Sequence, residues 1–510
     1  MESQGYLEQA GVSDAEWEQT PISVKRLFVV LTERLETQFQ QTEKQKTEIE
    51  WLKEKLSRDS GNSSLPPSTD EKKRVYPKRE KSGKQRGAQA GHESHFRKLR
   101  AVEECESVED YYPEQCWSCG AALEQVEGEP TRHQVVEIPP IQLQVKEYRL
   151  HQCVCTHCQC LTRASLPSEV SAKGYGPRVV AIVGVLSGMY RQSQRMVQAG
   201  MSDLFGLKLS LGSINNLRHE SSQAVAIPVA QAQGYVQQSA VVGADETGFR
   251  QGNSDGHNPE GRKAWLWVAV TPWVTFFQIT LSRSQASAQT LLGEAFKGKL
   301  ITDRHGAYTW VDQMFRQLCW AHLKRDFIQI AERSGVSGPL GTQLLLYEKR
   351  LFELWYQVRD GTMTRAELIE SVKPLRLSIQ ALLSEGAADP IGSQERSPLA
   401  QTVRTCRRLL NLEPAMCLFV SVEGVEPTNN DAERALRPAV IWRRLSLGAQ
   451  TQAGSIFVSR MLTVVSSLRS QNRNVLDFMT LAIQANREST SPPSLLPQHS
   501  SDTPQPTIAA

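Results

Sequence analysis

The most regular pattern of apolar and polar positions lies near the N-terminus of the chain. Over residues 21–57, apolar side chains recur every seven residues, with Phe28, Leu35, Ile49 and Leu56 in one set of positions. This spacing predicts a helix with one apolar stripe. The stripe is apolar at both ends and polar in the middle. Two interpretations stay open: a short, imperfect coiled coil that pairs two copies of the chain, or a helix packed on its own domain.

Strand-like patterns dominate the stretch that begins near residue 239. Residues 239–245 form a short apolar, β-branched run that ends in Asp245, and residues 299–303 repeat this design and end in Asp303. Between them, residues 264–282 are rich in Val and aromatic side chains and predict two strands joined at Thr271-Pro272. We expect a mixed sheet that displays both carboxylates at one edge.

A third acidic residue lies on a predicted helix. The pair Asn429-Asn430 precedes an acidic turn, and Asn side chains cap helices by accepting hydrogen bonds from free backbone N–H groups. Acidic side chains in the first turn also suit the helix dipole. A helix that begins near Asn430 places Glu433, Leu436 and Arg437 on one face. Taken alone, this stretch is an ordinary amphipathic helix with a surface ion pair.

The two strand-end aspartates change the interpretation of that helix. We predict that Asp245, Asp303 and Glu433 converge on two Mg²⁺ (or Mn²⁺) ions, because hard carboxylate oxygens are the ligands that these ions prefer. Such a pair would stabilise the attacking and leaving oxygens of a phosphodiester. The neighbouring acids fit less well. Glu246 should point to the opposite sheet face, and Asp431 lies elsewhere on the helix.

The cysteines of the chain are clustered. Cys116 with Cys119 and Cys155 with Cys158 form two CxxC pairs separated by a strand-rich interval, which is the spacing of a zinc ribbon. Four thiolates would close a tetrahedral structural site around one Zn²⁺ and leave no position open for catalysis. Cys319 lies apart and is expected to pack. Alternative ligands adjoin the second pair: Cys153, Cys160, His151 and His157.

Two further stretches have helical patterns. Residues 171–235 predict three helices, compatible with a helix-turn-helix whose last helix enters a DNA groove, although an all-helical connecting domain is the favoured alternative. Residues 328–420 have apolar positions at helical spacing. They predict a helical insertion between the second Asp and the Glu.

A basic run lies in the linker formed by residues 58–100. Runs of this kind are usually solvated and disordered, but beside a DNA-processing core they contact phosphates with salt-sensitive affinity. The residues predicted to bind DNA here are Lys72, Lys73, Arg74, Lys78, Arg79, Lys84 and Arg86.

Composition limits the classes of protein. At 510 residues the chain should hold several domains, and its net charge of +3 says little about nucleic acid. No uninterrupted apolar stretch approaches the roughly 20 residues of a membrane span, and no secretion signal is recognisable. We expect a cytoplasmic protein with no membrane partner.

Several motifs in order resemble the insertion sequence 66 family of bacterial transposases. The resemblance runs from about residue 52 to about residue 487. The matching stretches include Asp245, Asp303 and residues 429–455, the Cys-Trp-Ala-His stretch 319–325, residues 60–68 and residues 86–92.

The resemblance implies the Asp-Asp-Glu group of enzymes and a ribonuclease H-like fold. It implies that the metals at Asp245, Asp303 and Glu433 activate water for the first strand cut and a 3′-hydroxyl for strand transfer. Three side chains would orient DNA or a phosphate near this site: Arg304, His322 and Arg437. For His322, a hydrogen-bonded core histidine is the alternative. The family further implies small accessory proteins and assembly on DNA as at least a dimer. It also implies a bacterial protein that is associated with the nucleoid when bound to DNA.

The predicted architecture is therefore a multidomain α+β protein. Its expected parts are a helix or coiled coil (1–57), a basic flexible linker (58–100), a zinc ribbon (101–170), a helical DNA-binding region (171–235), a ribonuclease H-like α/β catalytic domain with a helical insertion (236–487, insertion about 328–420) and a disordered tail (488–510).

Three functions compete on this evidence. The favoured one is a transposase that binds the ends of an insertion element, cleaves the DNA and joins it to a target. The second is a domesticated or inactive transposase that acts as a DNA-binding protein. The third is an adaptor assembled through the coiled coil and the zinc ribbon, which leaves the strand-end acids unexplained.

Overall fold

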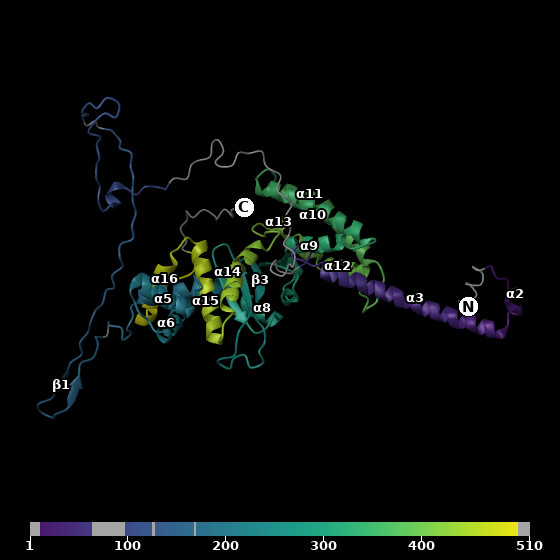
Figure 1. Ribbon diagram of the computed structural model, residues 1–510, viewed down its shortest axis with the longest axis horizontal. Helices are drawn as coiled ribbons and strands as arrows, with labels where there is room; N and C mark the ends of the chain where they lie inside the picture. Colours follow the sequence, from purple (N-terminus) through teal and green to yellow (C-terminus); the bar gives the residue numbers. More distant parts are fainter. Residues whose placement is uncertain (1–10, 64–96, 125–127, 168–169, 498–510) are drawn as a thin grey trace.

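A five-stranded mixed sheet forms the centre of the molecule in this computed structural model, which describes residues 11–63, 97–124, 128–167 and 170–497. The strands occur in the spatial order β5-β4-β3-β6-β7 (Figure 1). The first three form an antiparallel meander, and β6 and β7 continue the sheet in parallel with β3. Their bounds are β3 Val241–Phe249, β4 Ala264–Val270, β5 Thr275–Thr280, β6 Lys299–Thr302 and β7 Arg316–Leu318. The expectation of an α+β protein with a mixed sheet is confirmed.

Strand β3 is longer than the sequence predicts. The prediction that this strand ends at Asp245 is wrong, because β4 pairs with it from Gly243 through Phe249 and places Asp245 opposite Val268. The parallel neighbour β6 pairs with β3 only as far as Gly243. Asp245 therefore lies just beyond the parallel part of the sheet, while the antiparallel hairpin extends the strand.

The two other strand predictions are confirmed. β4 and β5 are joined at Thr271, whose N–H and hydroxyl both donate to the carbonyl of Val274 at 2.9 Å. β6 ends at Thr302, so Asp303 is the first residue after the strand.

One hydrophobic core joins the β3–β5 meander to helices from both ends of the chain. Figure 1 shows several of these helices together on one side of the sheet. The helices are α4 Pro177–Gly188, α5 Gln194–Phe205, α6 Leu211–Ala224, α7 Ala226–Gln237, α8 Gln285–Leu292, α14 Asn430–Ser446, α15 Gln452–Ser470 and α16 Val475–Glu488.

Helix α15 covers the free edge of the sheet. The hydroxyl of Thr463 accepts from the N–H of Phe277 at 3.0 Å. Ser467 accepts from the N–H of Thr275 and donates to its carbonyl, both at 3.1 Å. Unpaired backbone N–H and C=O groups on an edge strand can form hydrogen bonds with a strand of another chain. The hydroxyls on α15 satisfy them within the fold.

A second hydrophobic core lies on the other side of the sheet. It is built by helices between β7 and α14, and Figure 1 shows them grouped together. They are α9 Trp320–Ala331, α10 Ser337–Arg359, α11 Arg365–Ala387, α12 Pro398–Asn411 and α13 Leu418–Ser421, with the 3₁₀ turn η5 Glu413–Met416.

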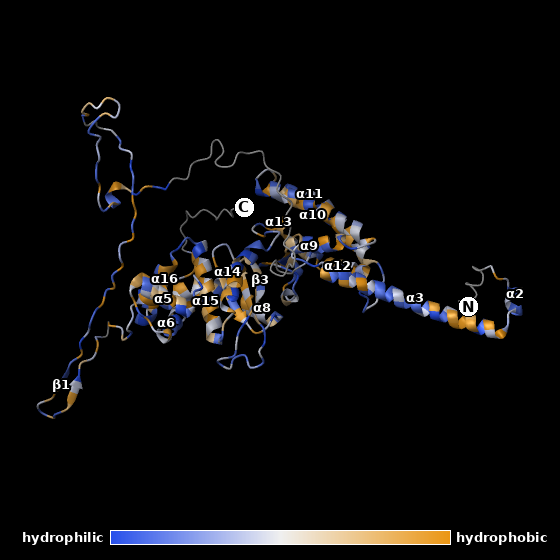
Figure 2. Cartoon of the chain, viewed as in Figure 1, coloured by the Kyte–Doolittle hydropathy of each residue, from blue (hydrophilic) through white to orange (hydrophobic). Residues whose placement is uncertain are grey.

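The N-terminal helix α3 (Ile22–Leu56) projects from this second group of helices (Figure 1). None of its residues is buried, and Figure 2 shows apolar colouring concentrated in its distal half. Its base is held by an ion pair of 3.0 Å between Glu54 and Arg333. Just after the helix, Asn62 donates to Glu332 at 2.8 Å. The predicted helix is confirmed, and its pairing with a second copy stays a prediction.

Residues 97–124 and 128–167 form an extended arm with little regular structure (Figure 1). Its strands are β1 Gln152–Val154 and β2 Leu161–Arg163, which pair antiparallel. The strand-rich interval expected over residues 135–154 is therefore wrong for residues 135–151, whose side chains are almost all exposed, and only its end, residues 152–154, is a strand.

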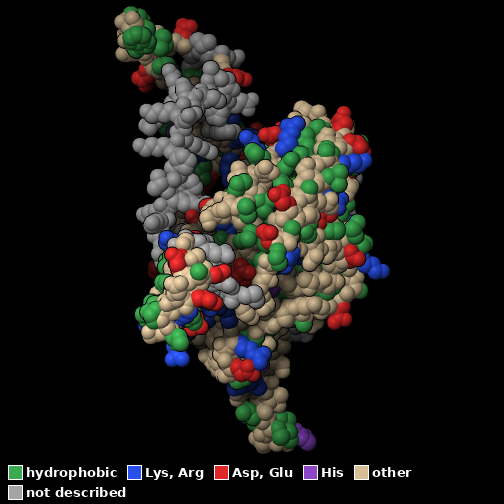
Figure 3. Space-filling model, turned by 90° about the vertical axis from the view of Figure 1, so that its right-hand side faces the viewer, with side chains coloured by type: hydrophobic (Ala, Val, Ile, Leu, Met, Phe, Trp, Pro, Cys, Tyr) green, Lys and Arg blue, Asp and Glu red, His purple; other side chains and the backbone are tan. Residues whose placement is uncertain are grey.

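Surface charge is mixed on the side of the molecule that faces along α3. Figure 3 shows acidic and basic side chains interspersed over this face. Among the described residues, no helix is both long enough and apolar enough to cross a membrane.

Candidate active site

Two of the three predicted carboxylates are brought together by strand register. Gly243 of β3 is aligned with Ile301 of β6 in the parallel pair, and Asp245 and Asp303 each lie two residues further along. Neighbouring strands are about 4.8 Å apart, and side chains two residues apart share a face. The register therefore places both carboxylates at the same level on the same side of the sheet.

Helix α14 carries the third carboxylate, and Asn429 anchors the start of that helix. Its side-chain amide donates to the carbonyl of Ala244 in β3 at 2.8 Å, next to Asp245. The expected capping role of Asn429 is wrong, because its side chain makes no cap hydrogen bond. The buried amide binds the strand instead. The helix begins at Asn430 as expected, and Glu433 lies in its first turn.

The electrostatics of the site show that the carboxylates act on one another. The pKa of Asp245 is raised well above its usual range, first by burial and then by the negative charges of Asp303, Glu246 and Glu433. The negative charges of three neighbouring carboxylates therefore act on the buried Asp245, and a concentration of acidic groups of this kind marks a candidate cation site.

Glu246 takes part in a separate buried network that the sequence did not reveal. Its carboxylate is fully buried and accepts from the hydroxyl of Tyr308 at 2.6 Å. It also pairs with Arg283 at 2.6 Å. Burial, followed by the charge of Glu246, raises the pKa of Tyr308 well above its usual range. This network confirms that Glu246 has partners of its own.

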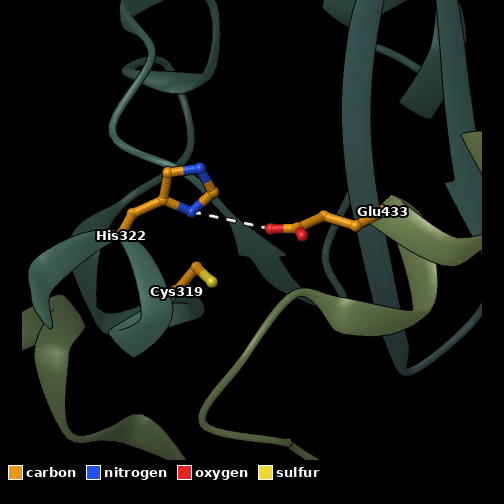
Figure 4. Close-up of side chains that lie close together, drawn as sticks. All are labelled: Cys319, His322 and Glu433. Atoms are coloured by element: carbon orange, nitrogen blue, oxygen red, sulfur yellow. Dashed lines mark ion pairs between the residues drawn. The ribbon is translucent and has the colours of Figure 1, made fainter. Parts of the chain in front are cut away.

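Cys319 and His322 lie against Glu433 (Figure 4). Nδ1 of His322 is 3.8 Å from Oε1 of Glu433, and both atoms are buried without a hydrogen-bond partner. Burial lowers the pKa of His322, and burial raises the pKa of the Cys319 thiol to about 11. The alternative for His322 was a core histidine held by hydrogen bonds. Its Nδ1 atom makes no hydrogen bond, so the structure does not support that alternative at this atom. Cys319 is buried, as expected, and it also borders Glu433.

The other residues expected to contact DNA are placed differently. Arg304 forms an ion pair with Asp326 at 2.5 Å and is only partly exposed. Arg437 is exposed on α14, one turn beyond Glu433. The predicted basic run from Lys72 to Arg86 lies outside the described residues.

The four cysteines of the predicted zinc ribbon are not gathered into one group of ligands among the described residues. The two pairs form matching turns, however. The N–H of Gly120 donates to the carbonyl of Cys116, and that of Gln159 donates to the carbonyl of Cys155, both at 2.9 Å. Backbone N–H groups lower the pKa of Cys116 and of Cys158. Each turn is shaped to present thiolates, and their shared zinc stays a prediction.

A large groove lies between α4–α6 and α14–α16. Its volume is about 1880 Å³. Ser210 caps α6, the last helix of a helix, turn and helix arrangement with α5. The exposed face of α6 presents Asn215, Asn216 and His219 to this groove. Buried and unpaired nitrogens of Arg191 and Arg218 also line it. The groove offers hydrogen-bond donors to an anionic ligand.

Clustered carboxylates on a mixed α+β fold are typical of enzymes that act on phosphodiesters with divalent metals. Comparison with known families gives the particular group. Residues 180–456, more than half of the chain, match the family described as Transposase IS66 family. The chain belongs to this family. Residues 12–98 match a second family, described as a family of unknown function (DUF6444).

Two curated relatives come from Sinorhizobium fredii. The uncharacterized protein y4qI is 27% identical over 239 residues, which cover 43% of this chain and 43% of the relative. The uncharacterized protein y4hP is 23% identical over 391 residues, covering 70% of this chain and 68% of the relative. The matched part thus spans less than half the length of the first relative.

Proposed function

We propose that this transposase cleaves DNA at the ends of its insertion element and transfers the strands by the Asp-Asp-Glu mechanism. The proposal is supported chiefly by the register of β3 and β6, which aligns Asp245 with the residue after β6, Asp303, and by the bond from Asn429 to β3, which fixes the start of the helix that carries Glu433. Like charges are brought together in a partly buried place, as the raised pKa of Asp245 records. Carboxylates clustered in this way are typical of functional sites, and here they would bind cations.

The order of the strands supports a ribonuclease H-like catalytic domain. An antiparallel meander is followed by two parallel strands on the other side of β3; Asp245 lies on this central strand, and Asp303 follows directly after its parallel neighbour β6. The helices α10 to α13 then form the helical insertion between the second Asp and Glu433.

The residues present fit two divalent cations. Glu433 holds a buried oxygen that has no hydrogen-bond partner, and all the predicted ligands offer the hard oxygen atoms that Mg²⁺ and Mn²⁺ take. When bound, these ions supply activation of the attacking oxygen and neutralisation of charge on the leaving oxygen. Asp245, Asp303 and Glu433 would hold them.

The rest of the chain positions these ligands. Asn429 ties the start of α14 to the central strand, so that Glu433 stays next to Asp245. The network of Glu246, Tyr308 and Arg283 anchors the strand from a neighbouring position. Rigid placement of this kind is what enzymes need in order to align reacting groups.

DNA would contact the chain at three places. The basic run from Lys72 to Arg86 supplies sequence-independent phosphate contacts. Helix α6 supplies the side chains that enter a groove of DNA, with Asn215 and Asn216 suited to base edges. Arg437, exposed beside Glu433, and His322 contact the phosphate near the site of cleavage.

Further parts of the proposal concern assembly. The apolar stripe of α3 would pair two copies of the chain, because an enzyme that joins DNA ends must hold two of them. One structural Zn²⁺ at Cys116, Cys119, Cys155 and Cys158 would fold the arm. Small accessory proteins encoded by the same element would complete the complex.

The test is cleavage of labelled DNA carrying the element ends, with Mg²⁺ or Mn²⁺, by wild type, Glu433→Gln and Asp431→Asn. Asp431 is a matched control because it is an exposed carboxylate on the same helix, paired with Arg434. We expect Glu433→Gln to lower cleavage by more than about 100-fold, beyond the loss seen when an outer-shell partner is removed. Asp431→Asn should cut like wild type. Equal cleavage by all three proteins would contradict the assignment.

The same assay addresses the second candidate, an inactive transposase that acts as a DNA-binding protein. The intact carboxylates weigh against it. Wild type that binds the element ends but cuts under no metal condition, with the accessory proteins present, would favour it.

A further inference from the structure

The starts of helices α9 and α14 bring a thiol, which is a soft ligand for metals, next to one of the proposed catalytic carboxylates. The thiol belongs to Cys319 and the carboxylate to Glu433. Cys319 precedes α9, and His322 lies three residues further on, so the two side chains share one face of the helix. Their ligand atoms and a carboxylate oxygen of Glu433 all lie within 4.8 Å of one another. Figure 4 shows the three side chains pointing toward one common space.

Backbone hydrogen bonds lock the two helix starts together. The N–H of Trp320 donates to the carbonyl of Pro427 at 2.9 Å. The N–H of Asn429 donates to Sγ of Cys319 at 3.2 Å. The segment that leads into α14 is therefore attached to the segment that leads into α9. The three ligands come from elements whose relative position is set by main-chain contacts, which is how rigid metal sites are built.

Two atoms of this cluster have unmet bonding capacity. Nδ1 of His322 and Oε1 of Glu433 are both buried, face each other at 3.8 Å, and have no hydrogen-bond partner. Buried polar atoms normally have partners, and a site for a bound ion is one explanation when they do not. Two ligands of one tetrahedral ion, each about 2.0–2.1 Å from it, lie roughly 3.3 Å apart. The observed separation is close to that value.

The donor set selects the kind of ion. Thiolate and imidazole favour zinc and related transition metals, whereas Mg²⁺ takes oxygen ligands. Three protein ligands leave a fourth position open.

We propose that Cys319, His322 and Glu433 form a binding site for Zn²⁺ or a similar transition metal, distinct from the predicted zinc ribbon. Glu433 belongs to this site and to the carboxylate cluster. An ion bound to Cys319 and His322 therefore withdraws Glu433 from the catalytic cations and inhibits cleavage. This inhibition rests on the proposed function, while the metal site itself does not.

The test uses Co²⁺ as the probe, because thiolate ligation gives it a sulfur-to-metal charge-transfer absorption. The full-length protein is titrated with Co²⁺ in a background in which the four ribbon cysteines are replaced by serine. We expect one bound ion with this absorption. Cys319→Ser should abolish the absorption, and Cys319→Ser and His322→Gln should each weaken binding by more than about 100-fold, beyond the loss of an outer-shell partner.

Cys406→Ser is the matched control. Cys406 is also fully buried in the second core, and burial likewise raises its pKa to about 11. The Cys406→Ser variant should bind Co²⁺ as tightly as the background protein does, with the same absorption. If the ribbon variant does not fold, the metal content of wild type and of Cys319→Ser is compared directly, and Cys319→Ser should hold one ion fewer. Cobalt binding that is unchanged by Cys319→Ser would overturn the proposal.

Cleavage assays separate this proposal from the proposed function. If the inhibition is real, Zn²⁺ added to the Mg²⁺ reaction inhibits wild type and Cys406→Ser at concentrations that leave residual Cys319→Ser activity unchanged. Cobalt binding through Cys319 in a protein that never cuts DNA would sustain the metal site and contradict the catalytic role. DNA cleavage by a protein whose cobalt binding does not depend on Cys319 would sustain the catalytic role and overturn the metal site.

Discussion

Asn429 connects three parts of the site at the scale of a single residue. Its amide donates to the central strand at Ala244, its main-chain N–H donates to Cys319, and its carbonyl accepts from the N–H of Glu433 at 3.1 Å. Its side-chain oxygen also lies against Gly243, where an added Cβ would be 3.1 Å away. One buried side chain thus sets the distance between α14 and β3.

Replacing this residue should loosen the site. We expect Asn429→Ala to lower the free energy of unfolding by about 1–3 kcal/mol, because the buried carbonyl of Ala244 loses its donor. Cleavage should also fall, because Glu433 is no longer held next to Asp245. Denaturant unfolding and the cleavage assay measure the two effects. Asn430→Ala is the control, since Asn430 is exposed at the first position of the helix. Equal behaviour of the two variants would contradict the anchoring role.

Asp326 allows a prediction about pH. Burial raises its pKa to about 6 despite the nearby charges of Arg304 and other arginines. Because the folded protein then binds more protons than the unfolded chain between about pH 4 and pH 6, this group makes the protein less stable as pH rises through that window. Above it, the loss is complete and amounts to about 3 kcal/mol.

Asp326→Asn should remove this dependence. Relative to wild type, the variant should gain stability as pH rises from about 4 to 6, and the difference should then stay constant. Thermal unfolding of both proteins across this range gives the measurement. A difference that does not change with pH would show that Asp326 titrates normally in the folded protein.

At the scale of elements, strands and helices followed from local patterns, while their contacts did not. The apolar runs before Asp245 and Asp303 marked β3 and β6, and the acidic turn marked α14. The extension of β3 to Phe249 was missed because it depends on β4, whose pairing is not visible in the run itself. Asn429 was given a capping role because its alternative partner, Ala244, is 185 residues away.

The residues of the site also fall into two groups: those predictable from their local sequence and those whose role depends on contacts made on folding. Acids at strand ends and helix starts have recognisable surroundings, so the sequence alone was enough to predict all three carboxylates as ligands. Tyr308 and Arg283 were missed, because a tyrosine in a turn and an arginine after a strand acquire a role only when folding brings them to Glu246. The position of Cys319 next to Glu433 likewise depends on the contact between α9 and α14.

Helix α3 yields a prediction at this scale. Leu31 and Leu35 are about half and two-thirds exposed on the apolar stripe. If this stripe pairs two copies of the chain, the double change Leu31→Lys and Leu35→Lys should convert a dimer to a monomer, because like charges would then face each other in the seam. Light scattering of the full-length protein reports the mass. Glu33→Lys, at an exposed position off the stripe, should stay dimeric. A monomeric wild type would contradict the pairing.

At the scale of the whole molecule, the catalytic cluster lies where the two hydrophobic cores meet. The first core includes β3 and α14, which carry Asp245 and Glu433. The second includes β6 residue Ile301 and the start of α9, near Asp303 and His322. The order of helices and strands was predictable from the sequence, but this meeting place was not, because it depends on how the two cores pack.

The central claim is that Asp245, Asp303 and Glu433 form one cation site. Iron-mediated protein cleavage tests it most directly, because Fe²⁺ in a Mg²⁺ site generates radicals that cut the nearest backbone. A Cys319→Ser background keeps the iron from the thiol. The claim predicts cuts near residues 245, 303 and 433 together, suppressed by excess Mg²⁺ and all lost in Asp245→Asn. Cuts at only one of the three places, or cuts that persist in Asp245→Asn, would contradict it.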